Sequence, residues 1–142
     1  MDKLCLEDQL CFKLYAISRQ ITGAYRPVLE NLDITYPQYL VMLVLWKENE
    51  ITVKELGKRL YLDSGTLTPL LKRLEQKKVI SRQRDTADER SVIITLTLEG
   101  KNMQQKAKKI PETLGKCLSL NQQEYLQLKD QLNNLLTQLE TR

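Results

Sequence analysis

The chain has 142 residues, of which 42% are hydrophobic and 28% charged, a mixture that excludes an intrinsically disordered protein and is enough for one domain with a modest core. The net charge of +4 favours an anionic partner only where Lys and Arg cluster. The sequence has no histidine, which excludes His-ligated metal sites and Ser-His or Cys-His catalytic pairs. We therefore expect neither a metal nor another cofactor.

The three cysteines, Cys5, Cys11 and Cys117, do not form a C-x-x-C motif, so no zinc knuckle or dithiol motif is indicated. Their odd number argues against a secreted disulfide framework. No apolar run approaches the length of about 18 residues that marks a membrane helix, and the acidic N-terminus does not resemble a signal peptide. We expect a cytoplasmic protein with reduced thiols and no membrane partner.

The first predicted element is a long helix. Apolar residues recur every three or four positions from Leu6 to about Leu29, and Pro27 should bend or end the last turn. Thr35 is a good N-cap for a second helix that has Pro37 in its first turn. This second segment, "YPQYLVMLVLWKEN", is apolar nearly all round, so we expect it to be buried.

Two short helices come next. Thr52 stands three residues before Glu55, a spacing typical of a capping box, and starts the segment "TVKELGKRL". Asp63 and Ser64 can cap the following helix, whose leucines recur at helical spacing through "TLTPLLKRLEQKK". Two short helices joined by a turn of about four residues form a helix-turn-helix pattern, and the second would be the recognition helix.

A β-hairpin is predicted after the helix-turn-helix. Two extended runs, Val79–Arg84 and Ser91–Thr97, flank a polar, charged loop that is too long for a two-residue turn. A helix-turn-helix followed by a basic hairpin is a winged helix.

The C-terminal part is predicted to be helical. Thr97 should cap a helix that Pro111 interrupts, and the segment after Ser119 has apolar residues at alternating spacings of three and four. Such a seam usually packs against another helix, so we expect a second copy of the chain to cover it. The first helix could contribute to the same interface. The seam residues are Tyr125, Leu128, Leu132, Leu135 and Leu139, with Leu6, Leu10 and Leu14 on the first helix.

The expected fold is therefore mainly α, with one domain over residues 1–142. Residues 35–97 would form the winged helix-turn-helix, with the wing at about 82–92. Residues 1–34 and 98–142 would provide the dimerisation helices of a homodimer.

Candidate nucleic-acid contacts lie on the outer face of the predicted recognition helix and in the wing. Small hydroxyl residues at a helix N-terminus suit close approach to bases and phosphates, and arginine in a wing suits a narrow minor groove. Asp88 is the nearest acid that could hold Arg90 in place. A plain amphipathic helix with a solvated face is the alternative. The candidates are Ser64, Thr66, Thr68, Lys72 and Arg73 on the helix, and Arg82, Arg84 and Arg90 in the wing.

The segments "DSGTLTPLLKRLE" and "DERSVIITLT" resemble the MarR family of dimeric winged-helix transcription regulators. The segments "QLCFKLYA" and "TYPQYLVMLVLW" narrow the resemblance to the organic hydroperoxide resistance regulators, the OhrR branch. The resemblance implies that the protein is a transcriptional repressor that responds to organic hydroperoxides, and not an enzyme. A cysteine near its N-terminus is oxidised by an organic hydroperoxide, and the dimer then leaves a palindromic site on double-stranded DNA.

The resemblance also implies roles for single residues. Cys11 matches the peroxidatic cysteine of the family, and Tyr25 and Tyr36 match two tyrosines that hydrogen-bond its sulfur from the partner subunit. Phenolic hydroxyls can stabilise a thiolate without adding charge. Asp63, Ser64 and Thr66 match DNA-facing positions of the recognition helix, and Arg82 and Arg90 match wing positions.

Several alternatives stay open. Oxidised Cys11 could be trapped by Cys117 of the partner subunit, by Cys5, or by a low-molecular-weight thiol of the cell. Helix spacing alone favours a buried structural role for Cys11, and the family motifs around it reverse that preference. The competing functions are a thiol peroxidase, a MarR-type regulator released by a small phenolic ligand, and a pure dimerisation module.

Overall fold

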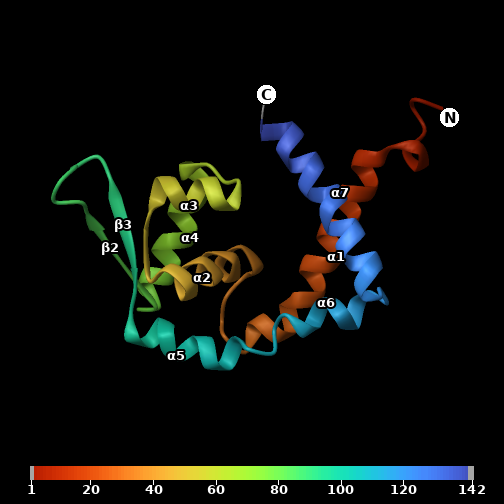
Figure 1. Cartoon of the computed structure of the whole chain (residues 1–142). Coiled ribbons are helices and arrows are strands. Elements are labelled where there is room, and N and C mark those ends of the chain that lie inside the picture. The colour runs from red at the N-terminus through yellow and green to blue at the C-terminus, as the bar shows by residue number, and fades with distance from the viewer. Residues whose placement is uncertain (1, 141–142) are drawn as a thin grey trace. The chain divides into compact units, whose positions relative to one another are not determined.

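The computed structural model describes residues 2–140 (Figure 1). The chain divides into two compact units, and the boundary falls between Ile110 and Pro111. The buried core belongs almost entirely to the first unit. None of the helices in the described residues is long and apolar enough to cross a membrane.

The first helix, α1 (Leu10–Glu30), follows a short 3₁₀ turn, η1 (Leu6–Asp8). The prediction of one helix from Leu6 was wrong because Gln9 has extended backbone angles and separates the two elements. Pro27 lies inside α1 and does not end it. Proline removes only one backbone donor, and burial of Leu29, which is 2% exposed, stabilises the last turn.

Helix α2 (Tyr36–Glu48) is the central helix of the first unit. It begins with the predicted cap at Thr35, where the side chains of Thr35 and Gln38 each accept a hydrogen bond from the other's backbone N–H. Val41, Met42 and Leu45 have no solvent exposure. The prediction that this helix is buried is confirmed.

Helices α3 (Val53–Leu60) and α4 (Ser64–Gln76) form the helix-turn-helix. The Thr52 hydroxyl accepts the backbone N–H of Glu55 at 3.1 Å, which is one half of the predicted capping box, while the Glu55 carboxylate lies 3.8 Å from Nε of Arg59. The backbone of the turn between the helices passes close to Gly57. A Cβ added at Gly57 would lie 2.7 Å from the backbone oxygen of Leu62, so the turn leaves no room for a side chain there.

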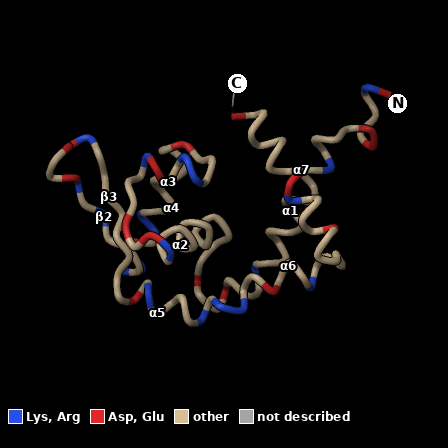
Figure 2. Tube along the Cα trace, in the orientation of Figure 1, with Lys and Arg blue, Asp and Glu red and all other residues tan. Residues whose placement is uncertain are grey.

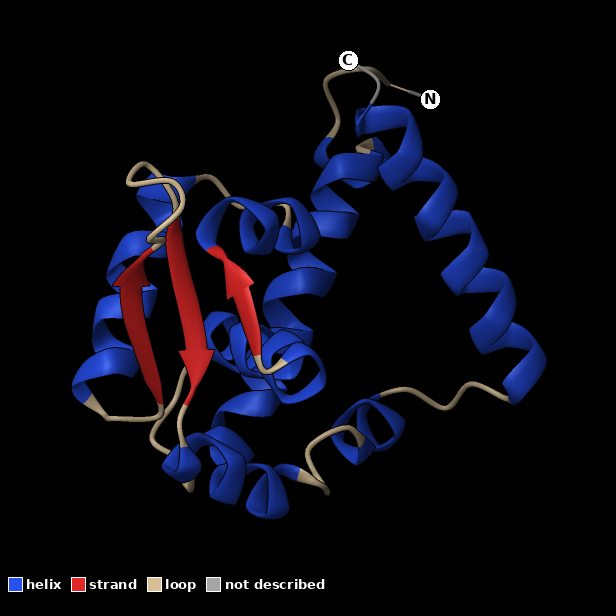
Figure 3. Ribbon diagram, turned by 60° about the vertical axis from the view of Figure 1, so that its left-hand side comes forward, coloured by secondary structure: helices blue, strands red, loops and turns tan. Residues whose placement is uncertain are grey.

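Three antiparallel strands form a sheet in the order β1-β3-β2 (Figure 3). The predicted hairpin is present as β2 (Ile80–Arg84) and β3 (Val92–Leu96). In addition, β1 (Glu50–Thr52) pairs with β3, with Ile51 opposite Ile94. The sequence prediction missed β1 because three residues are too few to establish an alternating pattern.

Helix α5 (Leu98–Ala107) is capped by Thr97, as predicted. The indole N–H of Trp46 on α2 donates to the Gly100 carbonyl at 2.9 Å, which ties α5 to the central helix. A Cβ on Gly100 would lie only 2.3 Å from the carbonyl oxygen of Val79, so this position requires glycine.

The second unit contains α6 (Glu112–Cys117) and α7 (Gln122–Glu140). The predicted interruption of the helix at Pro111 is confirmed. Among its described residues, α7 has no buried side chain, and its seam residues are about two-fifths exposed or more. Its apolar stripe is thus present but uncovered within the chain.

Candidate nucleic-acid interface and thiol site

The outer face of α4 carries the predicted contact residues. Leu67, Leu71 and Leu74 are 0–1% exposed and hold the opposite face in the core. The outer face is exposed at Ser64, Thr66, Thr68, Lys72 and Arg73. Burial of one face therefore leaves hydroxyl groups at the N-terminal end of the helix and cations towards its C-terminal end.

The N-terminus of α4 is fixed by Asp63. Its carboxylate accepts the backbone N–H of Thr66 at 2.7 Å, and this hydrogen bond holds the pKa of the Asp63 carboxyl below its ordinary value. The Thr68 hydroxyl donates to the carbonyl of Ser64 at 2.7 Å. The capped first turn is therefore well defined, and its serine and threonine side chains lie at the surface.

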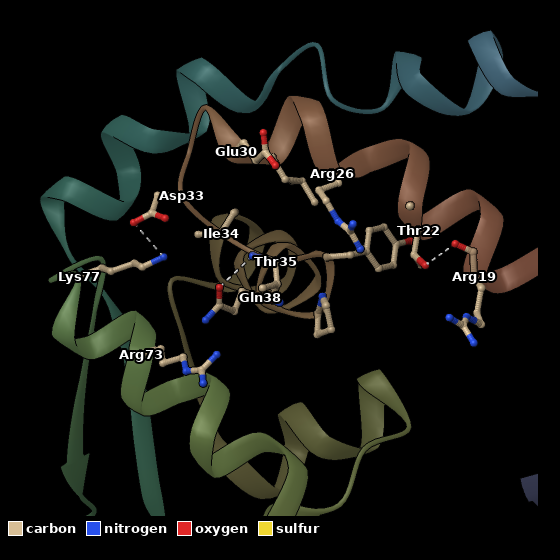
Figure 4. Close-up of a pocket in the computed structure, with 14 residues that line it drawn as sticks. Arg19, Thr22, Arg26, Glu30, Asp33, Ile34, Thr35, Gln38, Arg73 and Lys77 are labelled. Carbon is tan, nitrogen blue, oxygen red and sulfur yellow. Dashed lines mark hydrogen bonds and ion pairs between the residues drawn. The ribbon is translucent and has the colours of Figure 1, made fainter.

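Arg73 lines an open pocket between α4, α1 and the start of α2, together with Arg19 and Arg26 (Figure 4). At the end of α4, Lys77 pairs with Asp33, which follows α1, at 3.4 Å. The C-terminal end of α4 is thus in contact with the chain that links α1 to α2.

The wing loop is shaped by two aspartates. Asp85 accepts the backbone N–H of Ala87 at 3.0 Å, and Asp88 accepts the backbone N–H of Arg90 at 3.0 Å. Asp88 thus holds the backbone of Arg90. The sequence had instead indicated an ion pair between Asp88 and the Arg90 guanidinium. The Arg90 side chain is exposed, and Figure 2 shows both signs of charge in this loop.

Arg82 lies on strand β2, within the predicted extended run Val79–Arg84 and outside the wing loop. The strand β2 continues to Arg84, so the loop covers only residues 85–91. The Arg82 guanidinium donates from Nη2 and Nε to Oε1 of Glu75 on α4, at 3.0 and 3.3 Å. Opposite charges seven positions apart across a predicted turn were the only sequence signal for this pair.

Cys11 and Tyr25 lie towards opposite ends of α1, and Tyr36 is the first residue of α2. Cys11 is an exposed free thiol in the first turn. Tyr25 is 7% exposed, and the centre of its ring lies 5.0 Å from that of Tyr36 on α2. Tyr39 packs against both rings. The structure therefore brings the tyrosines together but does not bring them to Cys11 of the same chain.

The tyrosine cluster can supply hydrogen-bond donors. Burial raises the pKa of Tyr36 and of Tyr39 above the ordinary value of 10.0. Both phenols therefore keep their protons at neutral pH and can donate to an anionic group. This is the chemistry that a thiolate site requires.

The other thiols have different surroundings. Cys117 is exposed at the end of α6. The Cys5 thiol donates to the Glu7 carboxylate at 2.8 Å, which holds the pKa of that carboxyl below its usual value. Over residues 2–140, no group of His, Cys, Asp or Glu side chains could hold a metal ion.

Comparisons with known proteins identify related transcriptional regulators. The family model for the SarA/Rot transcriptional regulators matches residues 24–110. The chain is 52% identical over 140 residues to the organic hydroperoxide resistance transcriptional regulator of Bacillus subtilis, covering 99% of this chain and 93% of that protein.

Solved structures of AbfR from Staphylococcus epidermidis are also similar. Reduced AbfR bound to DNA has a TM-score of 0.81 and 41% identity, with 96% of this chain and 93% of that chain covered. Disulfide-formed AbfR has a TM-score of 0.65 and 42% identity, with 92% of each chain covered.

Proposed function

Because the chain belongs to the MarR family of winged-helix transcription regulators, in the branch of organic hydroperoxide resistance regulators, we propose that it acts as a homodimeric repressor whose DNA binding is controlled by oxidation of Cys11. It would bind double-stranded DNA at a palindromic operator in the cytoplasm. The two-fold symmetry of such a dimer matches the symmetry of a palindrome.

The observation that carries this proposal is the separation of Cys11 from the tyrosines. Cys11 and Tyr25 lie fourteen positions apart on α1, which is about 21 Å along the axis at about 1.5 Å per residue. Side chains do not span this distance. Cys11 therefore cannot receive hydrogen bonds from Tyr25 of its own chain, which supports the pairing with the partner subunit that the family resemblance implies.

The proposed redox step conserves atoms and electrons. The Cys11 thiolate attacks the distal oxygen of an organic hydroperoxide, so an S–O bond forms, the O–O bond breaks, and the alcohol leaves after taking up a proton. The resulting sulfenic acid then condenses with a second thiol, giving a disulfide and water. The existence of a disulfide form of AbfR supports this second step.

The second thiol is proposed to be Cys117 of the partner subunit. Its exposure makes it available for exchange. Cys5 and a low-molecular-weight thiol are the other candidates, and Cys5 is already hydrogen-bonded to Glu7. Non-reducing electrophoresis of Cys117→Ser and Cys5→Ser after oxidation distinguishes them. An intersubunit disulfide that persists in Cys117→Ser would contradict the assignment.

The DNA interface is proposed to consist of the exposed face of α4 and the wing. The N-terminal half of α4 would enter the major groove, and the wing arginines would reach the adjacent minor groove. The interface residues are Asp63, Ser64, Thr66, Thr68, Lys72, Arg73, Arg84 and Arg90.

A DNA-shift titration with cumene hydroperoxide tests the function. Wild type should bind operator DNA when reduced and release it on oxidation, whereas Cys11→Ser should bind and not release. Equal release by both proteins would overturn the role of Cys11. Multiple turnover of the hydroperoxide with a thiol reductant would instead indicate a peroxidase, and release by a phenolic ligand under reducing conditions would indicate a ligand-controlled regulator.

A further inference from the structure

Arg82 and Glu75 join the wing to the recognition helix. Glu75 is in the last turn of α4, and Arg82 is the middle residue of β2. Two nitrogens of the guanidinium share Oε1 of the carboxylate, at 3.0 and 3.3 Å. The Arg82 side chain is only 25% exposed. It is therefore directed against α4 and is less available to an outside ligand than the exposed Arg84.

The position of this ion pair allows it to restrict the orientation of the wing relative to α4. The turn between α4 and β2 contains Lys78 at φ 63, a conformation that reverses the chain sharply. Buried Ile80 anchors the start of β2. The Arg82–Glu75 pair adds a second anchor two residues further along the same strand face. Two anchors, unlike one, restrict the angle between the hairpin and α4.

The wing loop lies beyond the second anchor. It starts three residues after Arg82, which is about 10 Å along an extended strand. A small change of angle at Arg82 is therefore magnified at Arg90. Simultaneous contact of α4 with one groove and of the loop with the next requires that this angle be preset.

We propose that Arg82 is a positioning residue and makes no DNA contact: paired with Glu75, it holds the wing at the angle at which α4 and the wing loop engage DNA together. This rests on the DNA binding proposed above. The hydrogen bonds from Arg82 also hold the pKa of the Glu75 carboxyl below its ordinary value of 4.5, so this carboxyl is ionised throughout the neutral range.

Glu75→Gln is the most informative variant. Removing a negative charge near DNA strengthens binding if the pair has no positioning role. The proposal requires the opposite, a weakening of about threefold to fivefold, which is the range of a partly exposed ion pair. Arg82→Gln should weaken binding by a similar factor. The charge exchange Glu75→Arg with Arg82→Glu should restore part of the affinity.

The dependence of affinity on salt separates positioning from contact. A side chain that neutralises a phosphate changes the slope of log K against log salt by about 0.9. Arg82→Gln and Glu75→Gln should leave this slope unchanged, whereas the matched control Arg84→Gln should reduce it. Faster amide hydrogen exchange at residues 85–91 in both pair variants, with unchanged circular dichroism, is the expected structural signature.

Two results would overturn the proposal. Provided that wild type binds DNA, one such result is a reduced slope of log K against log salt for Arg82→Gln. The other is that Glu75→Gln binds DNA as tightly as wild type or more tightly. Absence of salt-dependent DNA binding by wild type would instead remove the proposed function, and this proposal with it. The two failures are therefore distinguished by the wild-type measurement alone.

Discussion

Helices α4 and α7 have leucines at the same helical spacing, yet they bury them very differently. Leu67, Leu71 and Leu74 of α4 are at most 1% exposed, whereas Leu132 and Leu135 of α7 are each 39% exposed. The winged-helix region buries its leucines within one chain, whereas the leucines of α7 remain partly exposed. An apolar stripe predicts a contact, but only the rest of the chain decides whether that contact is internal.

The largest effect is expected from a core leucine of α4. Leu71→Ala should lower the free energy of unfolding by about 2–5 kcal/mol, because the buried side chain leaves a cavity in a packed region. Urea unfolding monitored by circular dichroism measures this, and the loss should not depend on protein concentration. A loss below 1 kcal/mol would contradict an internally completed core.

A leucine-to-alanine substitution on α7 should affect association of the two copies and not folding of the winged-helix region. Leu132→Ala should leave the winged-helix region folded and weaken association of the two copies by roughly 1.5–3 kcal/mol, the value of burying one such side chain. Sedimentation at several concentrations measures the dimer dissociation constant. Glu140→Ala, near the exposed end of the same helix, is the control. An unchanged dissociation constant for Leu132→Ala would show that another surface joins the copies.

A cap within the first unit should have a smaller effect. Thr97→Ala removes the hydroxyl that accepts the Gly100 N–H and donates to the Lys78 carbonyl. We expect the free energy of unfolding to fall by about 1 kcal/mol, with no change in dimerisation. Thr97→Ser, which keeps the hydroxyl, should behave like wild type in the same urea experiment.

The smallest effect is expected at the exposed cap of α4, and it should depend on pH. The pKa of Asp63 is lowered in the folded chain, so the fold stabilises the ionised carboxyl. That stabilisation is present above the ordinary value of 3.8 and is lost as pH falls through the lowered folded pKa. The gap in stability between wild type and Asp63→Asn should therefore narrow below that pH in thermal unfolding, whereas Thr97→Ala should show no such trend.

Local patterns predicted most of the fold. The caps at Thr35, Asp63 and Thr97 are short-range signals, and the structure contains all three. The predicted end of the first helix near Leu29 agrees with α1, whereas its predicted start at Leu6 was wrong because Gln9 separates η1 from α1. The short strand β1 was missed because it exists only through its pairing with β3.

The candidate site was less predictable for the same reason. The exposed face of α4 follows from helical spacing, so its residues could be named in advance. The engagement of Arg82 with Glu75 depends on how β2 packs against α4, which periodicity does not report. The separation of Cys11 from Tyr25 follows from the predicted long helix, whereas the packing of Tyr25 against Tyr36 depends on how α1 contacts α2.

The continuity of α1 has a consequence for genetics. Each proposed sensor takes its sulfur from one chain and its phenols from the other, so a mixed dimer of one defective and one normal chain would keep one complete site. Pairing a Cys11→Ser chain with a chain lacking the hydroxyls of Tyr25 and Tyr36 leaves one site with neither half and one site complete. If one complete site is enough for release, two inactive alleles would complement each other, and α1 would be the spacer that makes the proposed sensing a property of the pair.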